Sequence, residues 1–274
     1  MRVAEPLGST WKARLSLGFA EQEGRTALVR RAADGPLVVQ KPLYPEGGAV
    51  CHAIVVHPPG GIAGGDELEL CVASGARAAA LLTTPGAAKW YRSAGPWAMQ
   101  KLAFDVDGVL EWLPRETIMF DGALADLRWD VRLGVEAAFI GWEVVCLGRT
   151  ASGERFQRGR VKLETRISRG GQMRWLERGR IDGAAASMGS PAGLSGHTVF
   201  GTLVASGGRL TREVLTACRA EAGDAALTLL PDLLVARYLG DSGEQAMQCF
   251  TRLWRVLRPA VAGRAASMPR IWST

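Results

Sequence analysis

Charged and apolar residues alternate along several segments in the middle of the chain, and this pattern predicts β-strands. In residues 160–167 (RVKLETRI), charged residues occupy every second position, with apolar residues or threonine between them. Residues 127–133 (LRWDVRL) and 67–72 (ELELCV) alternate in a similar way. A period of two is typical of strands that bury one face and expose the other.

Turn-forming residues separate these segments. They recur about every 8–15 positions from about residue 24 to about residue 210. Asp34-Gly35 and Asp107-Gly108 each lie between apolar runs and predict β-hairpins. No long helical pattern interrupts this region, so the sequence favours an extended β architecture over alternating βαβ units.

Helical patterns are confined to the C-terminal third of the chain. Apolar residues at 246, 250, 253 and 257 share one helical face. Ser242 and Gln245 suit a capping box before this helix, and Pro259 is predicted to end it after Arg258. Residues 211–223 form a shorter candidate helix that Gly223 closes.

No internal repeat or low-complexity linker divides the chain, so residues 1–274 are predicted to form a single domain. Small residues concentrate at 184–196 (AAASMGSPAGLSG), where we expect a flexible loop. The fold class predicted from these patterns is mainly β, with two helices in the C-terminal third.

Composition limits the class of protein further. Hydrophobic residues make up 47% and charged residues 22%, an ordinary globular mixture. No apolar run approaches the roughly 18–20 residues that a transmembrane helix needs, and the first residues lack the apolar core of a secretion signal. The five cysteines form no CxxC pair, which favours reduced core thiols. We therefore expect a cytoplasmic protein.

The chain is basic, with a net charge of +6 and an isoelectric point near 9.4. It contains no block of five or six like charges. An acidic protein partner explains this charge as well as RNA does.

Residues 57–66 (HPPGGIAGGD) hold two prolines and four glycines. A phosphate-binding loop needs Lys and Ser or Thr after its last glycine, whereas Asp66 and Glu67 stand there and would repel phosphate. A dinucleotide site needs a helix after the glycines, whereas a strand pattern follows. The segment is therefore either a close-packed connection between strands or a site in which His57 and Asp66 bind a metal.

Two further acidic residues are candidates for a metal site. Glu143 interrupts the apolar run 137–147 (AAFIGWEVVCL), where a charge is costly unless it is paired or functional. An ion pair with an arginine and a functional role both remain open. Glu177 lies in phase with Met173 and Trp175, so we expect it to face inward. Together with Asp66, these carboxylates suit a hard or borderline divalent cation.

Enzymatic motifs are weak. Cys51 and His52 could suggest a nucleophile and its base, but adjacent strand residues point to opposite faces. We therefore expect a core thiol beside a surface histidine. The sequence contains no GxSxG motif. A hydrolase with an Asp/Glu pair and a nucleic-acid-binding module are the alternative classes of function.

Five segments in register resemble the urease accessory protein family UreD, also called UreH. They are 57–66, 83–93 (TTPGAAKWYRS), 110–120 (LEWLPRETIMF), 142–149 (WEVVCLGR) and the terminal 253–272 (LWRVLRP…PRIW). The resemblance spans nearly the whole chain. It implies a mainly β fold, an irregular β-helix-like stack of strands with two helices.

The resemblance also implies a function without catalysis. UreD-type proteins link apo-urease to UreF, which recruits the GTPase UreG, and nickel is proposed to pass through their interior. By position in the motifs, Asp66, Glu143 and Glu177 resemble the acidic residues of that route, and His57 is a further candidate ligand. The expectation is nickel in transit, with no tightly bound cofactor and with neither nucleic acid nor membrane as partner.

Four other residues are predicted to take part in binding. Lys89 and Tyr91 lie in the second motif, where the family can carry Ser in place of Ala88. The helix at 243–258 and the tail after it are expected to contact UreF, with Trp254 and Trp272 as anchors. Equally, both tryptophans could be ordinary core residues. The family can also carry Asp at the position of Glu143.

Overall fold

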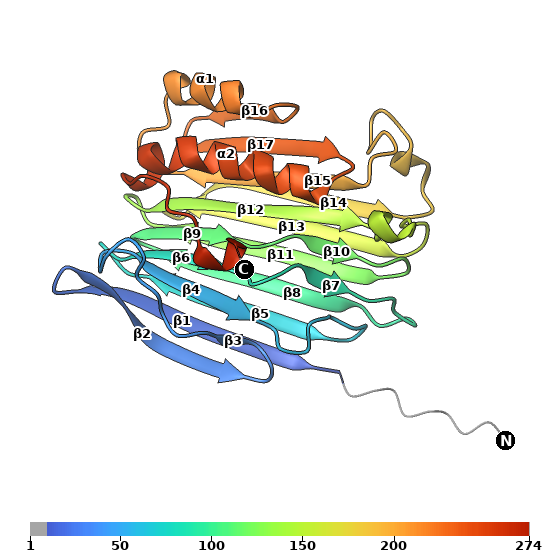
Figure 1. The fold of residues 1–274 in the computed structure, drawn as a ribbon, viewed down its shortest axis with the longest axis horizontal. Helices are drawn as coiled ribbons and strands as arrows, with labels where there is room; N and C mark the ends of the chain where they lie inside the picture. Colours follow the sequence, from blue (N-terminus) through green and yellow to red (C-terminus); the bar gives the residue numbers. More distant parts are fainter. Residues whose placement is uncertain (1–9, 274) are drawn as a thin grey trace.

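A computed structural model describes residues 10–273, which form two packed β-sheets and two α-helices (Figure 1). The seven-stranded sheet contains β1 (Lys12–Gln22), β2 (Arg25–Asp34), β5 (Glu67–Ser74), β8 (Ala98–Val106), β11 (Leu124–Leu133), β13 (Arg160–Arg169) and β14 (Gln172–Asp182). The ten-stranded sheet contains β3 (Val38–Val39), β4 (Cys51–Val56), β6 (Ala79–Thr83), β7 (Ala88–Trp90), β9 (Val109–Leu113), β10 (Thr117–Met119), β12 (Ala138–Leu147), β15 (Val199–Ser206), β16 (Ala226–Leu230) and β17 (Leu233–Gly240). The mainly β prediction is confirmed.

The middle of the chain coils between the two sheets. From β4 to β13 the long strands alternate, one in each sheet, so that successive turns of the coil add parallel neighbours. The pairs β5–β8, β8–β11 and β11–β13 are parallel in one sheet, and β4–β6, β6–β9 and β9–β12 are parallel in the other. This is the β-helix-like stack that the family resemblance implies.

The two predicted hairpin turns are wrong. Asp34-Gly35 follows β2 and leads to β3, and Asp107-Gly108 joins β8 to β9, so each turn changes sheet. A Cβ on Gly108 would lie 2.3 Å from the carbonyl oxygen of Ala78. Successive turns of the coil pack so closely here that only glycine fits. The hairpins β1–β2 and β13–β14 instead turn at Glu23-Gly24 and Gly170-Gly171, where all four residues have positive φ.

The predicted alternation is present in the strands. Leu68, Leu70 and Val72 of β5 are buried, as are Leu127, Trp129, Val131 and Leu133 of β11. The charged residues between them lie on the opposite face of the seven-stranded sheet. The main core therefore fills the space between the two sheets.

Both predicted helices are present: α1 (Arg212–Glu221) and α2 (Gly243–Ala262). Ser242 caps α2 by accepting a hydrogen bond from the Gln245 amide, as predicted. The prediction that Pro259 ends this helix is wrong, because α2 continues to Ala262 and is closed by Gly263 with φ of 67°. Pro259 lies on the exposed side of the last turn, where a missing backbone donor costs little.

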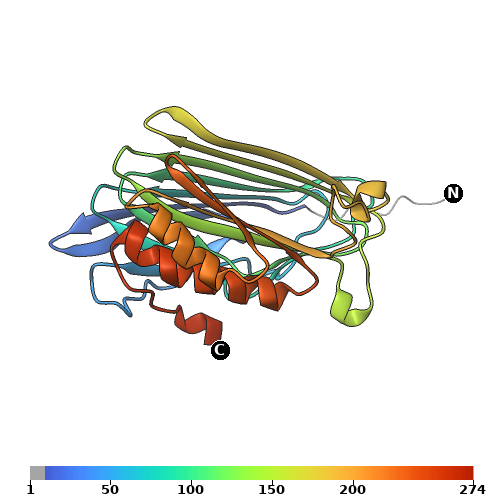
Figure 2. The same ribbon diagram turned by 90° about the horizontal axis from the view of Figure 1, so that it is seen from above.

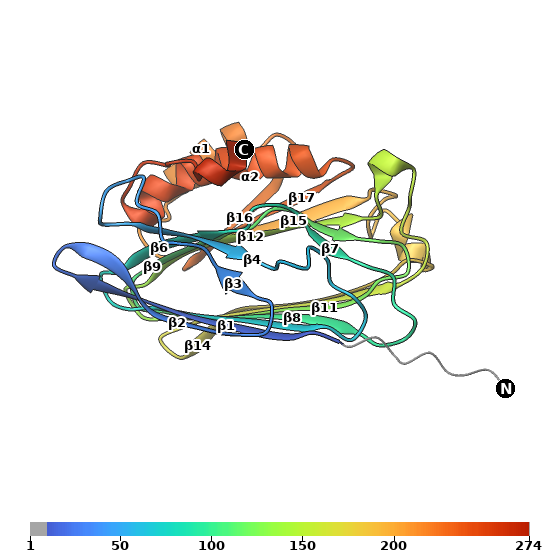
Figure 3. The same cartoon turned by 60° about the horizontal axis from the view of Figure 1, so that its bottom comes forward.

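The helices cover only one outer face of the molecule. They pack on the ten-stranded sheet through a second apolar cluster, while the outer face of the seven-stranded sheet carries no helix (Figure 3). The segment 184–196 links β14 to β15 and contains one 3-10 turn, Ala186–Met188. The other 3-10 turns are Thr150–Ser152 and Arg270–Ser273. Within residues 10–273, no helix has the length and apolarity needed to cross a membrane.

Candidate functional site

A partly open cavity of about 320 Å³ lies between the two sheets, beside the glycine-rich segment. Its walls come from residues 57–62, from residues 84–89 and from apolar side chains of β5, β8 and β9. Two of the sequence motifs, 57–66 and 83–93, are therefore brought together on one cavity. They are joined by backbone hydrogen bonds, since the Ile62 amide donates to Lys89 and the Tyr91 amide donates to Ile62.

Asp66 holds the glycine-rich segment in place. One carboxylate oxygen accepts a 2.8 Å hydrogen bond from the Trp11 amide, and the other accepts a 2.8 Å bond from the Ala63 amide. The side chain is only 2% exposed. Both oxygens of its carboxylate are thus bound to backbone amides, one in its own loop and one at Trp11, the residue before β1.

Close packing explains the glycines of this segment. A Cβ on Gly61 would lie 2.0 Å from the ring of Tyr91, and a Cβ on Gly64 would lie 2.3 Å from the hydroxyl of Ser93. Gly65 adopts φ of 95°, which side chains rarely allow. The close-packed connection considered for this segment is present, and it forms part of a cavity wall at the same time.

His57 is the one histidine on this cavity. Its Nε2 atom is buried and has no hydrogen-bond partner within residues 10–273. Burial lowers the pKa of His57, and the charge of Asp66 opposes this shift. A neutral imidazole with a free nitrogen can ligate a borderline cation.

Glu143 and Glu177 line a second, smaller cavity between the sheets. This cavity measures about 70 Å³ and lies among β11, β12, β13, β14, β15 and β17. Burial raises the pKa of Glu143 to about 7, and the nearby charge of Glu177 adds to the shift. Within residues 10–273, Glu143 has no hydrogen bond or ion pair to its carboxylate. The ion pair with an arginine that the sequence left open for Glu143 is therefore absent within residues 10–273.

Glu177 faces inward, as predicted, but it has a cation beside it. Its carboxylate lies 2.7 Å from the guanidinium of Arg237, which also lines the second cavity. Both side chains are partly exposed, at 28% and 47%. The second cavity thus combines two half-buried carboxylates, of which Glu177 is paired with Arg237 and Glu143 has no partner among residues 10–273.

A cluster of aromatic rings lies between the two cavities. Trp112 lines the first cavity and Trp129 lines the second. Phe104 contacts both, with ring-centroid distances of 5.9 Å to Trp112 and 6.4 Å to Trp129. The predicted metal residues are therefore separated: His57 lines the first cavity, and Glu143 and Glu177 line the second. Asp66 lines neither cavity and binds the backbone at Trp11 and Ala63.

The four predicted binding residues have different environments. Lys89 is exposed at the mouth of the first cavity, and Tyr91 is 41% exposed and packs edge-on against Phe120. Trp254 is fully buried and belongs to the core in this conformation. Trp272 is half-buried, contacts the rings of Trp142 and Trp254, and donates a 2.8 Å hydrogen bond to Thr83.

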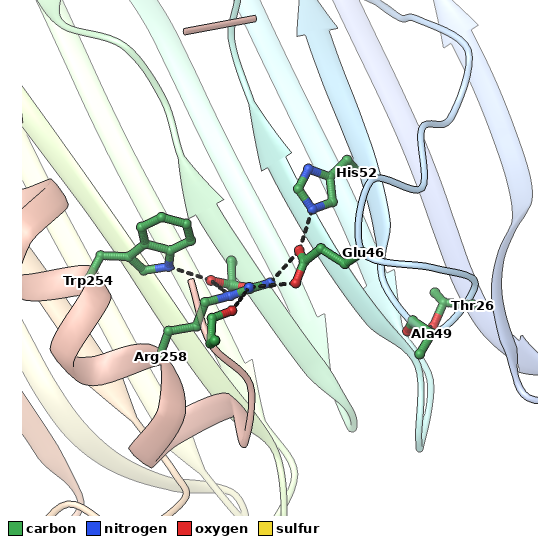
Figure 4. Close-up of polar contacts among 8 residues, drawn as sticks. Thr26, Glu46, Ala49, His52, Trp254 and Arg258 are labelled. Atoms are coloured by element: carbon green, nitrogen blue, oxygen red, sulfur yellow. Dashed lines mark hydrogen bonds and ion pairs between the residues drawn. The ribbon is translucent and has the colours of Figure 1, made fainter. Parts of the chain in front are cut away.

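A buried charge network attaches α2 to the ten-stranded sheet. Figure 4 shows Arg258 reaching from α2 to the carboxylate of Glu46, which also contacts His52. On its other side Arg258 donates to Glu111, at 2.9 and 3.0 Å, and Trp254 donates to the same carboxylate at 2.6 Å. Burial acts to raise the pKa of Glu46, but the hydrogen bonds from Arg258 and His52 hold it below its usual value.

This network was missed in the sequence analysis. The expectation that His52 lies at the surface is wrong, because β4 is covered on both faces and His52 is 4% exposed. One indication was available: Glu111 lies within the apolar run 109–113 (VLEWL), just as Glu143 lies within its own apolar run.

The donor set argues against a closed metal cage. Within residues 10–273, no group of three or more His, Cys, Asp or Glu side chains is placed to hold one ion. The cavities instead offer isolated donors: one imidazole at the first, and one unpaired and one paired carboxylate at the second. Donors separated in this way do not form a complete coordination shell for one ion.

Comparisons with known proteins point to one family. The family described as UreD urease accessory protein matches residues 12–273. The Azoarcus sp. (strain BH72) protein named "Urease accessory protein UreD" is 53% identical, over 96% of this chain and 94% of its own length. Proteins of the same name from Dechloromonas aromatica and Nitrosococcus oceani are 49% and 48% identical, covering 99% and 97% of this chain and 98% and 91% of their own.

Proposed function

Because the chain belongs to the UreD family of urease accessory proteins, we propose that it is a urease maturation factor. In this proposal it is a cytoplasmic, non-catalytic scaffold that links apo-urease to the UreF–UreG accessory complex. It assists the delivery of nickel to the urease active site. The observation that carries the proposal is the family match over residues 12–273, together with a first cavity whose walls include motifs 57–66 and 83–93.

Nickel in transit is the cargo, and the space between the sheets is the proposed route. His57 at the first cavity supplies a nitrogen donor, and Glu143 and Glu177 at the second supply oxygen donors. Nickel accepts both kinds of ligand. A route between the cavities crosses the cluster of Phe104, Trp112 and Trp129, so passage requires these rings to move.

Asp66 has a different part in this proposal. Both of its oxygens already accept backbone hydrogen bonds, and using them for nickel would release the loop. We therefore assign Asp66 to holding His57 and its loop at the first cavity. Glu143 is the best placed ligand, because it lines the second cavity and its carboxylate has no cation paired with it among residues 10–273.

The UreF contact is assigned to the solvent side of α2 and to the tail that follows it. Arg255 and Met268 are exposed there. Trp254 lies on the buried side of α2 and contacts Trp272 of the tail. Trp272 packs over Trp142 and Trp254, so removing the tail would uncover the core. Point changes at exposed positions are therefore better probes of this contact than truncation.

The experiment is co-expression of the urease operon with this gene present, absent or altered, with urease activity and urease nickel content measured together. The test variant is Glu143→Gln with Glu177→Gln. The matched control is Glu69→Gln, which changes the same chemistry on β5 but on the outer face of the seven-stranded sheet, where Glu69 contacts Arg14 and Lys101. We expect both measurements to fall severalfold with the test variant and to stay unchanged with the control.

The two possible failures are distinct. Fully nickel-loaded urease in the absence of the gene would contradict the maturation role itself. Normal loading with the double variant, but none without the gene, would leave the maturation role in place and would contradict the carboxylate route.

A further inference from the structure

The β13–β14 hairpin carries an excess of positive charge. Residues 160–182 contain seven Lys and Arg and three Asp and Glu, a net charge of +4 in a chain whose total is +6. Strand β14 ends the seven-stranded sheet, so within residues 10–273 its outer edge pairs with no other strand. Figure 2 shows the hairpin at the side of the molecule away from α1 and α2.

The cations on the outer face of this hairpin outnumber their carboxylate partners. The face carries Arg160, Lys162, Arg166, Arg178 and Arg180, against Glu164 and Asp182. Asp182 pairs with Arg160, and Glu164 is shared between Arg166 and Arg178. No carboxylate pairs with Lys162 or Arg180 among the described residues.

Lys162 and Arg180 are direct cross-strand partners. Like charges in this arrangement destabilise a sheet. A sheet that only needed a soluble edge could place an acid at either position, as the pair Arg160–Asp182 does one step away. Lys162 has some compensation, because its ammonium lies 4.1 Å from the centre of the Trp97 ring and Asp126 of β11 is its neighbour on the other side. Arg180 lies on the edge strand, and a carboxylate from outside that binds beside it relieves the repulsion.

Exposed apolar side chains continue the same face toward the hairpin turn. Leu176 is 48% exposed and Met173 is 55% exposed, and Val135 in the adjoining β11–β12 turn is 72% exposed. A strand edge protected only by charge would not need three large apolar residues beside it. Arginine and methionine are both enriched in protein interfaces.

We propose that this hairpin is a docking surface for an acidic, extended segment of a partner protein. The segment pairs with the free edge of β14, its carboxylates contact Lys162, Arg178 and Arg180, and its apolar side chains cover Leu176 and Met173. This mode gives affinity through main-chain hydrogen bonds and specificity through alternate side chains. The surface lies outside the two cavities, so it does not depend on the nickel route.

The test uses the full-length chain and fluorescence anisotropy with labelled probes. The first probe is a ten-residue peptide in which Glu and Val alternate, and the second is the same peptide with Lys in place of Glu. The third is a 20-nucleotide polyuridine RNA. The test variant is Arg180→Glu, which places an acid opposite Lys162 and should fold at least as well as the natural chain.

The matched control is Arg31→Glu on β2, the strand at the opposite edge of the same sheet, where Arg31 is also exposed. We expect the Glu/Val peptide to bind, and Arg180→Glu to weaken it at least tenfold while Arg31→Glu leaves it unchanged. Equal binding of the Lys/Val peptide, no binding of the Glu/Val peptide, or no effect of Arg180→Glu would contradict the proposal. Tighter binding of RNA that is lost in Arg180→Glu would overturn it in favour of a nucleic-acid surface.

Discussion

Two glutamates on neighbouring strands of the same sheet have opposite environments, and Glu111 is buried whereas Glu143 is half-buried. Glu111 on β9 lies beneath α2 and accepts hydrogen bonds from Trp254 and Arg258. Glu143 on β12 faces the other side of the sheet, toward the second cavity, and has no such partner within residues 10–273. Burial raises the pKa of both, but for Glu111 the contacts with Arg258 and Trp254 oppose the shift, whereas for Glu143 the charge of Glu177 adds to it.

The difference separates a charge that supports the fold from a candidate functional group. Glu111 joins α2 to the sheet, and its desolvation is offset by a cation and an indole donor in direct contact. Glu143 has no such compensation, so the natural sequence keeps a group that costs stability. A perturbed, unpaired carboxylate in a cavity is a candidate functional group.

Replacing Glu111 should have the largest effect. Glu111→Ala leaves the Arg258 guanidinium buried with one carboxylate fewer and leaves the Trp254 donor without its acceptor. We expect the free energy of unfolding, measured by urea denaturation, to fall by about 3–5 kcal/mol. Glu221→Ala on the exposed side of α1 is the control and should change it by less than about 0.5 kcal/mol. A similar small loss for Glu111→Ala would show that the network does not hold α2.

Asp66 should behave like Glu111, although the sequence grouped it with Glu143. Asp66→Asn replaces one acceptor oxygen by an amide group that cannot accept from the Trp11 or Ala63 backbone. We expect a loss of about 1–3 kcal/mol in the free energy of unfolding. Increased stability of this variant would mean that Asp66 is a strained ligand of the kind proposed for Glu143.

Glu143→Gln should have the opposite sign and should depend on pH. The pKa of Glu143 is raised in the folded protein, from 4.5 to about 7. Between these values the folded state binds more protons than the unfolded state, so stability falls as pH rises through this window. Glutamine removes this effect, and at pH 8 we expect the variant to be more stable than the natural chain by about 1–2 kcal/mol.

The comparison is made by urea denaturation at several pH values. The advantage of Glu143→Gln should vanish below about pH 4.5, where the natural carboxyl is protonated in both states. Glu177→Gln in the natural background removes the neighbouring charge and should lower the pKa of Glu143. An advantage that is independent of pH would show that Glu143 does not titrate in this window.

The sequence by itself determined the local structure and the family. Alternation predicted strands β5, β11 and β13, because burial on one face imposes a period of two wherever a strand lies on a core. The cap at Ser242 was predictable because both partners lie within four residues. The five motifs in register indicated the UreD family, which the comparisons confirm.

Only the tertiary structure decided which charged groups are satisfied. Glu111 and Arg258 are 147 positions apart in the chain, and nothing near either residue indicates the other. The same holds for Asp66 and the Trp11 amide, and for the two Asp-Gly turns, whose strands pair with different neighbours. The physical reason is that periodicity is a local property. The partner of a buried charge is instead set by how the coil of strands stacks, which brings distant segments to the same place.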